Sequence, residues 1–205
     1  MPSVSVPTRR PRSRPRRRCR DGIRTADRLL ASIHRWDPRT AEHCRRVADL
    51  ATAFARTIHF SAERVRLVRT AALLHDVGKV TIPRRILRKP GTLTAAERRI
   101  LDLHAPRGQA ILRLRPLPRE IADIVRFHHQ HYDGNGGGGG PRRGAAIPLV
   151  SRMLAIVDAY EAMTGDRTYR RPVSHDRACL ELKCHAGRQF DPALVADFLR
   201  AFGPH

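Results

Sequence analysis

The sequence has few aromatic residues and no long apolar segment. Its 205 residues include six Phe, three Tyr and one Trp, and no stretch approaches the roughly 18 consecutive apolar residues of a membrane-spanning helix. No apolar segment follows the arginines near the N-terminus, so the pattern of a secretory signal is also missing. The length suits one sizeable core and is too short for two, so we expect a single cytoplasmic domain without a membrane span.

Cysteine is also scarce, and its spacing does not indicate a metal-binding or disulfide framework. Cys19, Cys44, Cys179 and Cys184 form no C-x-x-C pair. Without an export signal, such cysteines are expected to be reduced thiols. The sequence therefore argues against zinc-finger chemistry and against disulfide bonds.

Acidic residues are few relative to basic ones, 19 against 40, which gives a formal net charge of +21. Eight arginines, four prolines and no acid occur within residues 1–20, and this composition predicts a disordered basic tail ahead of a domain over residues 21–205. With few aromatics for base stacking, the charge favours an anionic substrate over nucleic-acid binding. Contact of the tail with nucleic acid or an anionic membrane surface is the weaker alternative.

Apolar residues recur at helical spacing along most of the remaining chain. The spacing and the capping residues predict a helix over about 39–58, one capped by Ser61 and ending at Gly78, and one that starts with a Thr94–Glu97 capping box and carries His104. Further helices are predicted around 121–128, from Pro148, and from Asp191-Pro192. No segment alternates like a strand before a hairpin turn, so the predicted fold class is all-α, a single compact helical bundle.

Side chains of the metal-ligand types interrupt these apolar faces. The pair His75-Asp76 ends the apolar run AALL, for example, and Asp158 directly follows Ile156-Val157. A single inward histidine is ordinarily a hydrogen-bonded core residue. Five histidines and two aspartates near the buried sides of several helices would be costly to bury, however, unless they shared a metal. The candidate ligands are His43, His75, Asp76, His104, His128, His129 and Asp158.

Three segments in this order resemble the HD-GYP branch of the HD-domain metal-dependent phosphohydrolases. They are LLHDVGK (73–79), HHQHYDGNG (128–136) and AIVDAYEAMTGDRTYRRPVS (155–174). The resemblance covers about 36–203 and includes ILRKPGTLT (86–94) and QFDPALV (189–195). It implies an all-helical domain with a two-metal centre in its core. It also implies hydrolysis of cyclic di-GMP to linear pGpG, and on to GMP, by a hydroxide that bridges the metals.

The resemblance also implies a set of ligands and substrate-binding cations. One metal would be held by His43, His75, Asp76 and Asp158, and the other by Asp76, His104, His128 and His129, with Asp76 as the bridge. Arg39 stands where members with a third metal carry a glutamate, so two metals are expected. Mixed His/carboxylate ligands suit iron, manganese, nickel or zinc better than calcium or magnesium, and the family narrows the choice to iron or manganese.

Three cations are predicted to act on the substrate. Lys79 follows Asp76 by three residues and is expected to bind the scissile phosphate or to protonate the leaving oxygen, since a solvated surface lysine is the weaker alternative. Arg167 and Arg170 match positions that hold ligand phosphates in the family, where a guanidinium is well shaped for the task.

The sequence departs from the family pattern next to the ligands. Gln130 replaces an acid, Ala105 replaces a proline, and Gly137 and Gly138 occupy the Tyr and Pro positions of the GYP triplet. These changes remove no ligand, so we expect an intact metal site beside a flexible loop over about 134–144.

Two other functions are compatible with this pattern. One is an HD phosphohydrolase acting on another nucleotide, because the loop typical of the subgroup is altered. The other is a non-catalytic domain that binds cyclic di-GMP or a partner protein, for which a diguanylate cyclase-type or other signalling protein is the expected class. The complete ligand set together with Lys79 favours an enzyme.

Overall fold

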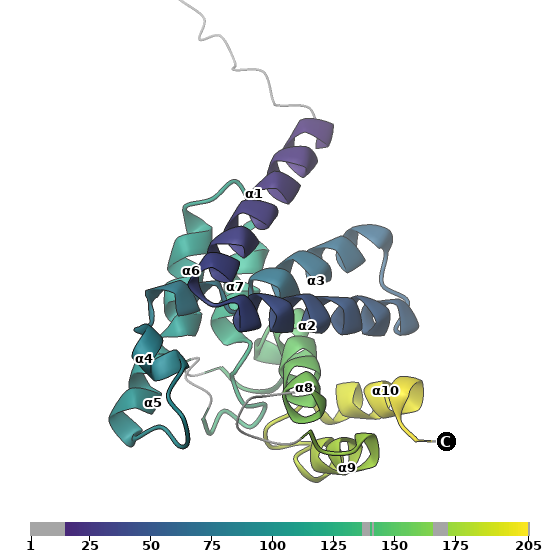
Figure 1. Ribbon diagram of the computed structural model, residues 1–205. Helices are drawn as coiled ribbons and strands as arrows, with labels where there is room; N and C mark the ends of the chain where they lie inside the picture. Colours follow the sequence, from purple (N-terminus) through teal and green to yellow (C-terminus); the bar gives the residue numbers. More distant parts are fainter. Residues whose placement is uncertain (1–14, 137–139, 141, 166–171, 205) are drawn as a thin grey trace, which may run out of the picture.

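The computed structural model describes residues 15–136, 140, 142–165 and 172–204, and the named elements of this part are all helices (Figure 1). The first half contains α1 (Pro15–Trp36), α2 (Pro38–Thr57), α3 (Ala62–Leu74), the 3-10 helix η1 (Val77–Thr81), α4 (Arg84–Leu87) and α5 (Ala95–Asp102). The second half contains α6 (His104–Arg113), α7 (Arg119–Phe127), the 3-10 helix η2 (Gly144–Ala146), α8 (Leu149–Thr164), α9 (His175–Cys184) and α10 (Pro192–Phe202). The predicted all-α fold class is confirmed.

Helix α2 lies at the centre of the bundle and is packed against α1, α3, α8 and α10. Its buried face includes Val47, Ala51 and Phe54. The ring of Phe54 meets that of Phe198 edge to face, with centroids 5.3 Å apart. Burial of one such side chain contributes on the order of 2–3 kcal/mol, so this apolar face fixes α2 against the C-terminal helices.

Helix α1 was not predicted from the sequence. It starts at Pro15, within the segment 1–20 that we expected to be disordered, and its N-terminal half projects away from the bundle (Figure 1). Farther along, Ala26 and Ile33 are buried against the core. Residues 1–14 lie outside the described part of the chain, and none of the described helices is both long and apolar enough to cross a membrane.

The predicted N-terminal caps are present, whereas two predicted helix ends are wrong. Ser61 accepts a hydrogen bond from the backbone N–H of Arg64, and Thr94 and Glu97 form the reciprocal capping box. Helix α3, however, ends at Leu74 rather than at Gly78, and α5 ends at Asp102 before reaching His104, which instead begins α6. At both ends a histidine side chain bonds a last-turn carbonyl, and such local bonds compete with helix continuation.

Gly78 brings η1 into direct backbone contact with α6. A Cβ at this position would lie 1.9 Å from the carbonyl oxygen of His104 and 2.7 Å from the backbone nitrogen of Gly108. No side chain fits at such distances, so only glycine allows this approach. The contact sets the distance between Asp76, which precedes η1, and His104.

The segment after His129 is tied to the segment before α10. The backbone N–H of Tyr132 donates to the carbonyl of Gln189 at 3.1 Å, and that of Asp133 donates to the carbonyl of Arg188 at 2.9 Å. Gly134 and Gly136 have φ angles of 84° and 137°, which favour glycine. The loop that we predicted to be flexible over 134–144 includes Gly137 and Gly138, and both lie outside the described residues.

A candidate metal centre

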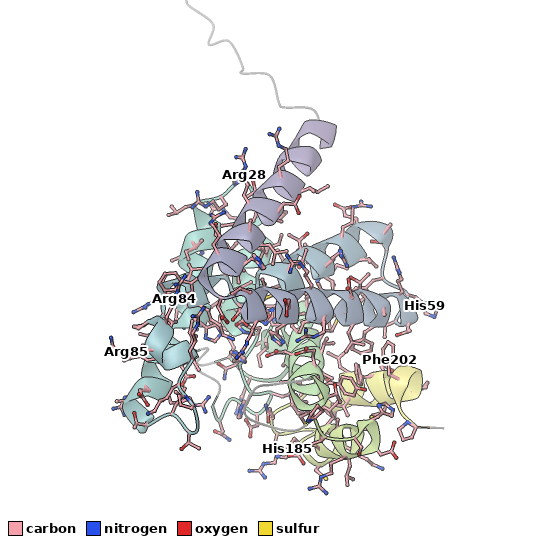
Figure 2. All side chains as sticks on the ribbon, viewed as in Figure 1. Arg28, His59, Arg84, Arg85, His185 and Phe202 are labelled. Atoms are coloured by element: carbon pink, nitrogen blue, oxygen red, sulfur yellow. The ribbon has the colours of Figure 1, made fainter. Side chains whose placement is uncertain are left out.

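Five segments supply the predicted ligands, and the structure brings all seven residues together. His43 lies in α2, His75 and Asp76 join α3 to η1, and His104 begins α6. His128 and His129 follow α7, and Asp158 lies in α8. The histidines His59 and His185, which we did not assign as ligands, lie instead at the edge of the molecule (Figure 2).

Two groups of ligand atoms form around Asp76. The ligand atoms of His43, His75 and Asp158 lie within 4.8 Å of one another, and so do those of His104, His128 and His129. Oδ2 of Asp76 is 3.4 Å from Nε2 of His75, while Oδ1 is 3.4 Å from Nε2 of His104. Each carboxylate oxygen of Asp76 therefore faces a different group, as a bridging ligand would.

Three of the histidines are held in the orientation that a metal ligand needs. Nδ1 of His75 donates to the carbonyl of Ala72, that of His104 to Leu101, and that of His128 to Val125, each at 2.7 Å. A proton held on Nδ1 leaves the Nε2 lone pair free. The backbone of the preceding helical turn thus sets both the tautomer and the ring orientation.

Several ligand atoms have no hydrogen-bonding partner within the described chain, although they are buried. Nε2 of His75 and Oδ1 of Asp76 are such atoms, and Nε2 of His104 faces Nε2 of His128 at 3.4 Å. Unpaired buried polar atoms are costly, and two facing lone pairs repel each other. Divalent cations between these atoms would satisfy them, so the residues present fit a metal centre.

Glu161 orients His43 and was not anticipated from the sequence. Its carboxylate accepts a hydrogen bond from Nδ1 of His43 and another from Arg46, whereas Nε2 of His43 points to Oδ1 of Asp158 at 2.9 Å. Glu161 follows Asp158 by three residues in α8, so both lie on one helix face. This spacing is the sequence signal that could have identified it. Cys44 is a second unanticipated neighbour, with its sulfur close to His75 and Asp76.

The two histidine groups differ in charge state. Burial alone would lower the pKa of His43 and of His75, but the neighbouring carboxylates Asp158 and Asp76 outweigh burial and raise both pKa values above 6.5. In the second group, burial lowers the pKa of His104 to about 4 and that of His128 well below its usual range. Without metal, the first group therefore holds protons to higher pH than the second group.

A cavity of about 480 Å³ opens beside the ligands, and Lys79 lies on its wall. Nζ of Lys79 donates to Oδ2 of Asp76 at 2.6 Å. Although burial opposes its charge, the Asp76 carboxylate raises the pKa of Lys79, and the ammonium stays protonated. The other two predicted substrate-binding cations, Arg167 and Arg170, lie outside the described residues.

Comparison with known protein families shows which family the chain belongs to. A family model described as HD domain matches residues 26–194. The chain belongs to the HD-domain family. The predicted relationship to the HD-domain phosphohydrolases is thereby confirmed. Cyclic di-GMP phosphodiesterases, the class that the HD-GYP resemblance implied, are among the relatives of this HD domain.

The relatives of this HD domain include several phosphodiesterases. It is 35% identical over 86% of its length to the cyclic di-GMP phosphodiesterase response regulator RpfG of Xanthomonas campestris. It is 36% identical over 82% to the 3'3'-cGAMP-specific phosphodiesterase 2 of Vibrio cholerae, and 34% identical over 80% to a cyclic di-GMP phosphodiesterase of Thermotoga maritima. The chain spans 47%, 32% and 45% of the lengths of these relatives, respectively.

Two solved structures share the fold. The HD domain of the L. monocytogenes phosphodiesterase PgpH in complex with cyclic-di-AMP superposes with a TM-score of 0.62 at 22% identity, over 85% of this chain and 92% of that one. Bd1817, an HD-GYP-type protein of Bdellovibrio bacteriovorus, also gives 0.62, at 15% identity, over 76% of this chain and 50% of that one. At these identities the likeness establishes the helical architecture alone.

Proposed function

We propose that this chain is a metal-dependent phosphodiesterase that opens a cyclic dinucleotide, cyclic di-GMP in the first place, to its linear form pGpG. The observation that carries the proposal is the position of Asp76, whose two carboxylate oxygens face two separate histidine groups next to an open cavity. Relatives at 34–36% identity that are named as phosphodiesterases of cyclic dinucleotides support it.

The ligand groups would hold two divalent ions, iron or manganese. His43, His75 and Asp158 would hold one, His104, His128 and His129 the other, and Asp76 would contact both. Such ions supply Lewis-acid chemistry, which lowers the pKa of water and neutralises charge on phosphoryl oxygens. Imidazole and carboxylate ligands together favour first-row transition metals over calcium or magnesium.

Lys79 would act on the substrate as a fixed positive charge. Hydrolysis breaks one P–O ester bond, adds a water oxygen to phosphorus and leaves a proton on the departing oxygen. A lysine whose pKa is raised is a poor proton donor at neutral pH. We therefore assign Lys79, whose ammonium is held on Asp76 at the cavity wall, the electrostatic role of stabilising charge on the scissile phosphate.

A second candidate substrate is another cyclic dinucleotide, such as 3'3'-cGAMP or cyclic-di-AMP. It is favoured by relatives named as 3'3'-cGAMP-specific phosphodiesterases and by the PgpH complex. The cavity walls include Gln130, His131 and Gln189, whose side chains offer donors and acceptors to a nucleobase.

Product analysis on metal-loaded protein tests both candidates. Purified chain would be loaded with Mn²⁺ or with Fe²⁺ under anaerobic conditions and incubated with cyclic di-GMP, 3'3'-cGAMP and cyclic-di-AMP, with Asp76→Asn as the inactive control. Conversion of cyclic di-GMP to pGpG at the highest kcat/KM is expected. Cleavage of another member of the panel instead would reassign the substrate, and metal-loaded protein that binds but cleaves none of them would indicate a binding domain.

A further inference from the structure

Arg98 shares the cavity with the metal ligands. The residues that line the cavity include His43, Lys79, His104 and Asp158, together with Arg98 from α5. Among the described residues, Lys79 and Arg98 are the lysine and arginine side chains on this wall. They come from different elements, η1 and α5, so positive charge is presented to the cavity from two places.

The guanidinium of Arg98 is free, whereas the ammonium of Lys79 is bound. Lys79 donates to Asp76 at 2.6 Å. Arg98 is exposed, and within the described chain its guanidinium forms no hydrogen bond or ion pair. Its neighbour Glu97 is already engaged, because its carboxylate accepts from Lys89 at 2.6 Å and from the backbone N–H of Thr94 at 2.8 Å. Arg98 is therefore available to an anion that enters the cavity.

One face of α5 is directed towards the cavity. Arg98, Leu101 and Asp102, at positions i, i+3 and i+4, all line it. The Asp102 carboxylate lies one helical turn beyond Arg98, yet no ion pair joins the two side chains in the described chain. The capping box at Thr94 and the Lys89–Glu97 pair fix the start of α5, so the helix presents Arg98 from an anchored position.

A cyclic dinucleotide contains two phosphodiester groups, and one metal centre can act on only one of them at a time. We propose that Arg98 binds the phosphodiester that is not being cleaved, and so makes the site selective for substrates with two phosphates. A guanidinium pairs well with phosphate oxygens through two parallel N–H donors. This inference rests on the proposed function, since it takes the phosphate at the metal centre to be the one that is hydrolysed.

The test compares substrates with two phosphates and with one. Arg98→Gln, Arg98→Lys and Arg99→Gln would be assayed with cyclic di-GMP and with bis(p-nitrophenyl) phosphate, a diester that has a single phosphate. Arg99 is a matched control, because it is the next residue in α5, is exposed and does not line the cavity. Metal content would be measured for each variant.

Arg98→Gln should raise the KM for cyclic di-GMP about tenfold, on the scale of one charged hydrogen bond at an exposed rim. Its kcat, its metal content and its kcat/KM for bis(p-nitrophenyl) phosphate should stay within about twofold of the parent values. The KM of Arg98→Lys for cyclic di-GMP should lie between those of the parent and of Arg98→Gln. The KM of Arg99→Gln should equal that of the parent.

Three outcomes would overturn the assignment. An unchanged KM for cyclic di-GMP in Arg98→Gln, with an active parent, would remove Arg98 from substrate binding. An equal loss of kcat/KM for both substrates in Arg98→Gln would assign Arg98 a structural role. An equal rise of the KM for cyclic di-GMP in Arg99→Gln would show that any positive charge on α5 has the same effect. A parent chain that cleaves bis(p-nitrophenyl) phosphate but none of the cyclic dinucleotides would contradict the proposed function itself, separately from Arg98.

Discussion

Nζ of Lys79 lies 2.6 Å from Oδ2 of Asp76, the same oxygen that faces Nε2 of His75 at 3.4 Å. The pair places a permanent positive charge against the carboxylate at the centre of the ligand set. Replacement of Lys79 is expected to lower kcat without loss of metal, whereas replacement of Asp76 should lower both. This difference separates metal binding from catalysis.

Lys79→Met should retain metal while kcat falls by about 100-fold, the size typical of one electrostatic group in an active site. Metal analysis together with steady-state kinetics measures both quantities. Lys183→Met is the control, because Lys183 is exposed in α9, away from the ligands. An unchanged kcat would make Lys79 a structural partner of Asp76 and no more.

Asp76→Asn should lose activity and most of the bound metal, because one carboxylate faces both histidine groups. The amide has nearly the same shape, so the fold should persist, which circular dichroism would check. Full activity in this variant would contradict the bridging role.

Glu161→Gln should weaken metal binding by about tenfold or more, because the second-sphere carboxylate that orients His43 loses its charge. The affinity for Mn²⁺ can be measured by calorimetry. Glu120→Gln is the matched control, since Glu120 also bonds an arginine, Arg64, but is more exposed and lies at the start of α7. Equal affinities in both variants would leave Glu161 with a packing role only.

Gly78→Ala should destabilise the fold by about 1–3 kcal/mol or displace η1, because its Cβ would collide with the His104 carbonyl. Loss of metal is expected in the same variant, since the Gly78 contact sets the distance between Asp76 and His104. Gly22→Ala in α1 is the control. A Cβ there would meet its nearest neighbour at 3.7 Å, and the better helix propensity of alanine should leave stability equal or slightly higher. Denaturant unfolding and metal content measure the two effects.

Metal binding should release protons from one group of ligands and not from the other. The pKa values of His43 and His75 are raised by the neighbouring carboxylates, so a metal competes with protons at this group to higher pH than at an ordinary histidine, and affinity there should rise with pH. His104, with a pKa of about 4, is already neutral above about pH 5 and should release none. Calorimetry in buffers of different ionisation enthalpy counts the protons, and His43→Gln should release about one fewer. Equal release from both groups would contradict this assignment.

Local sequence patterns predicted the helices better than their ends. The caps at Ser61 and Thr94 involve neighbours in the chain, and both were predicted. The break between α5 and α6 was not, because Ile100 and His104 keep an i, i+4 spacing across it. Helix α1 was not predicted at all, since the arginines and prolines of residues 1–20 indicate a disordered segment.

The seven residues of the candidate metal centre were proposed from ordered motifs, and the structure brings them together, whereas the contacts that support them were not predicted. His75 and Asp76 occur in one recognisable segment. The bond between His43 and Glu161 joins residues 118 positions apart, and periodicity carries no information on which residues meet at such a separation. The same applies to Arg98, whose place on the cavity wall depends on how α5 lies against the rest of the bundle.

Three helices end beside the metal centre. Helices α3, α5 and α7 stop at Leu74, Asp102 and Phe127, one or two residues before His75, His104 and His128. The C-terminal end of a helix carries a partial negative charge from its aligned peptide dipoles, equivalent to roughly half an elementary charge. At His75 and His128 the backbone therefore contributes negative potential where divalent cations would bind, whereas at His104 the N-terminus of α6 offsets the end of α5. Two helix ends thus add to the negative charge of Asp76 and Asp158 in a chain that has about twice as many basic as acidic residues.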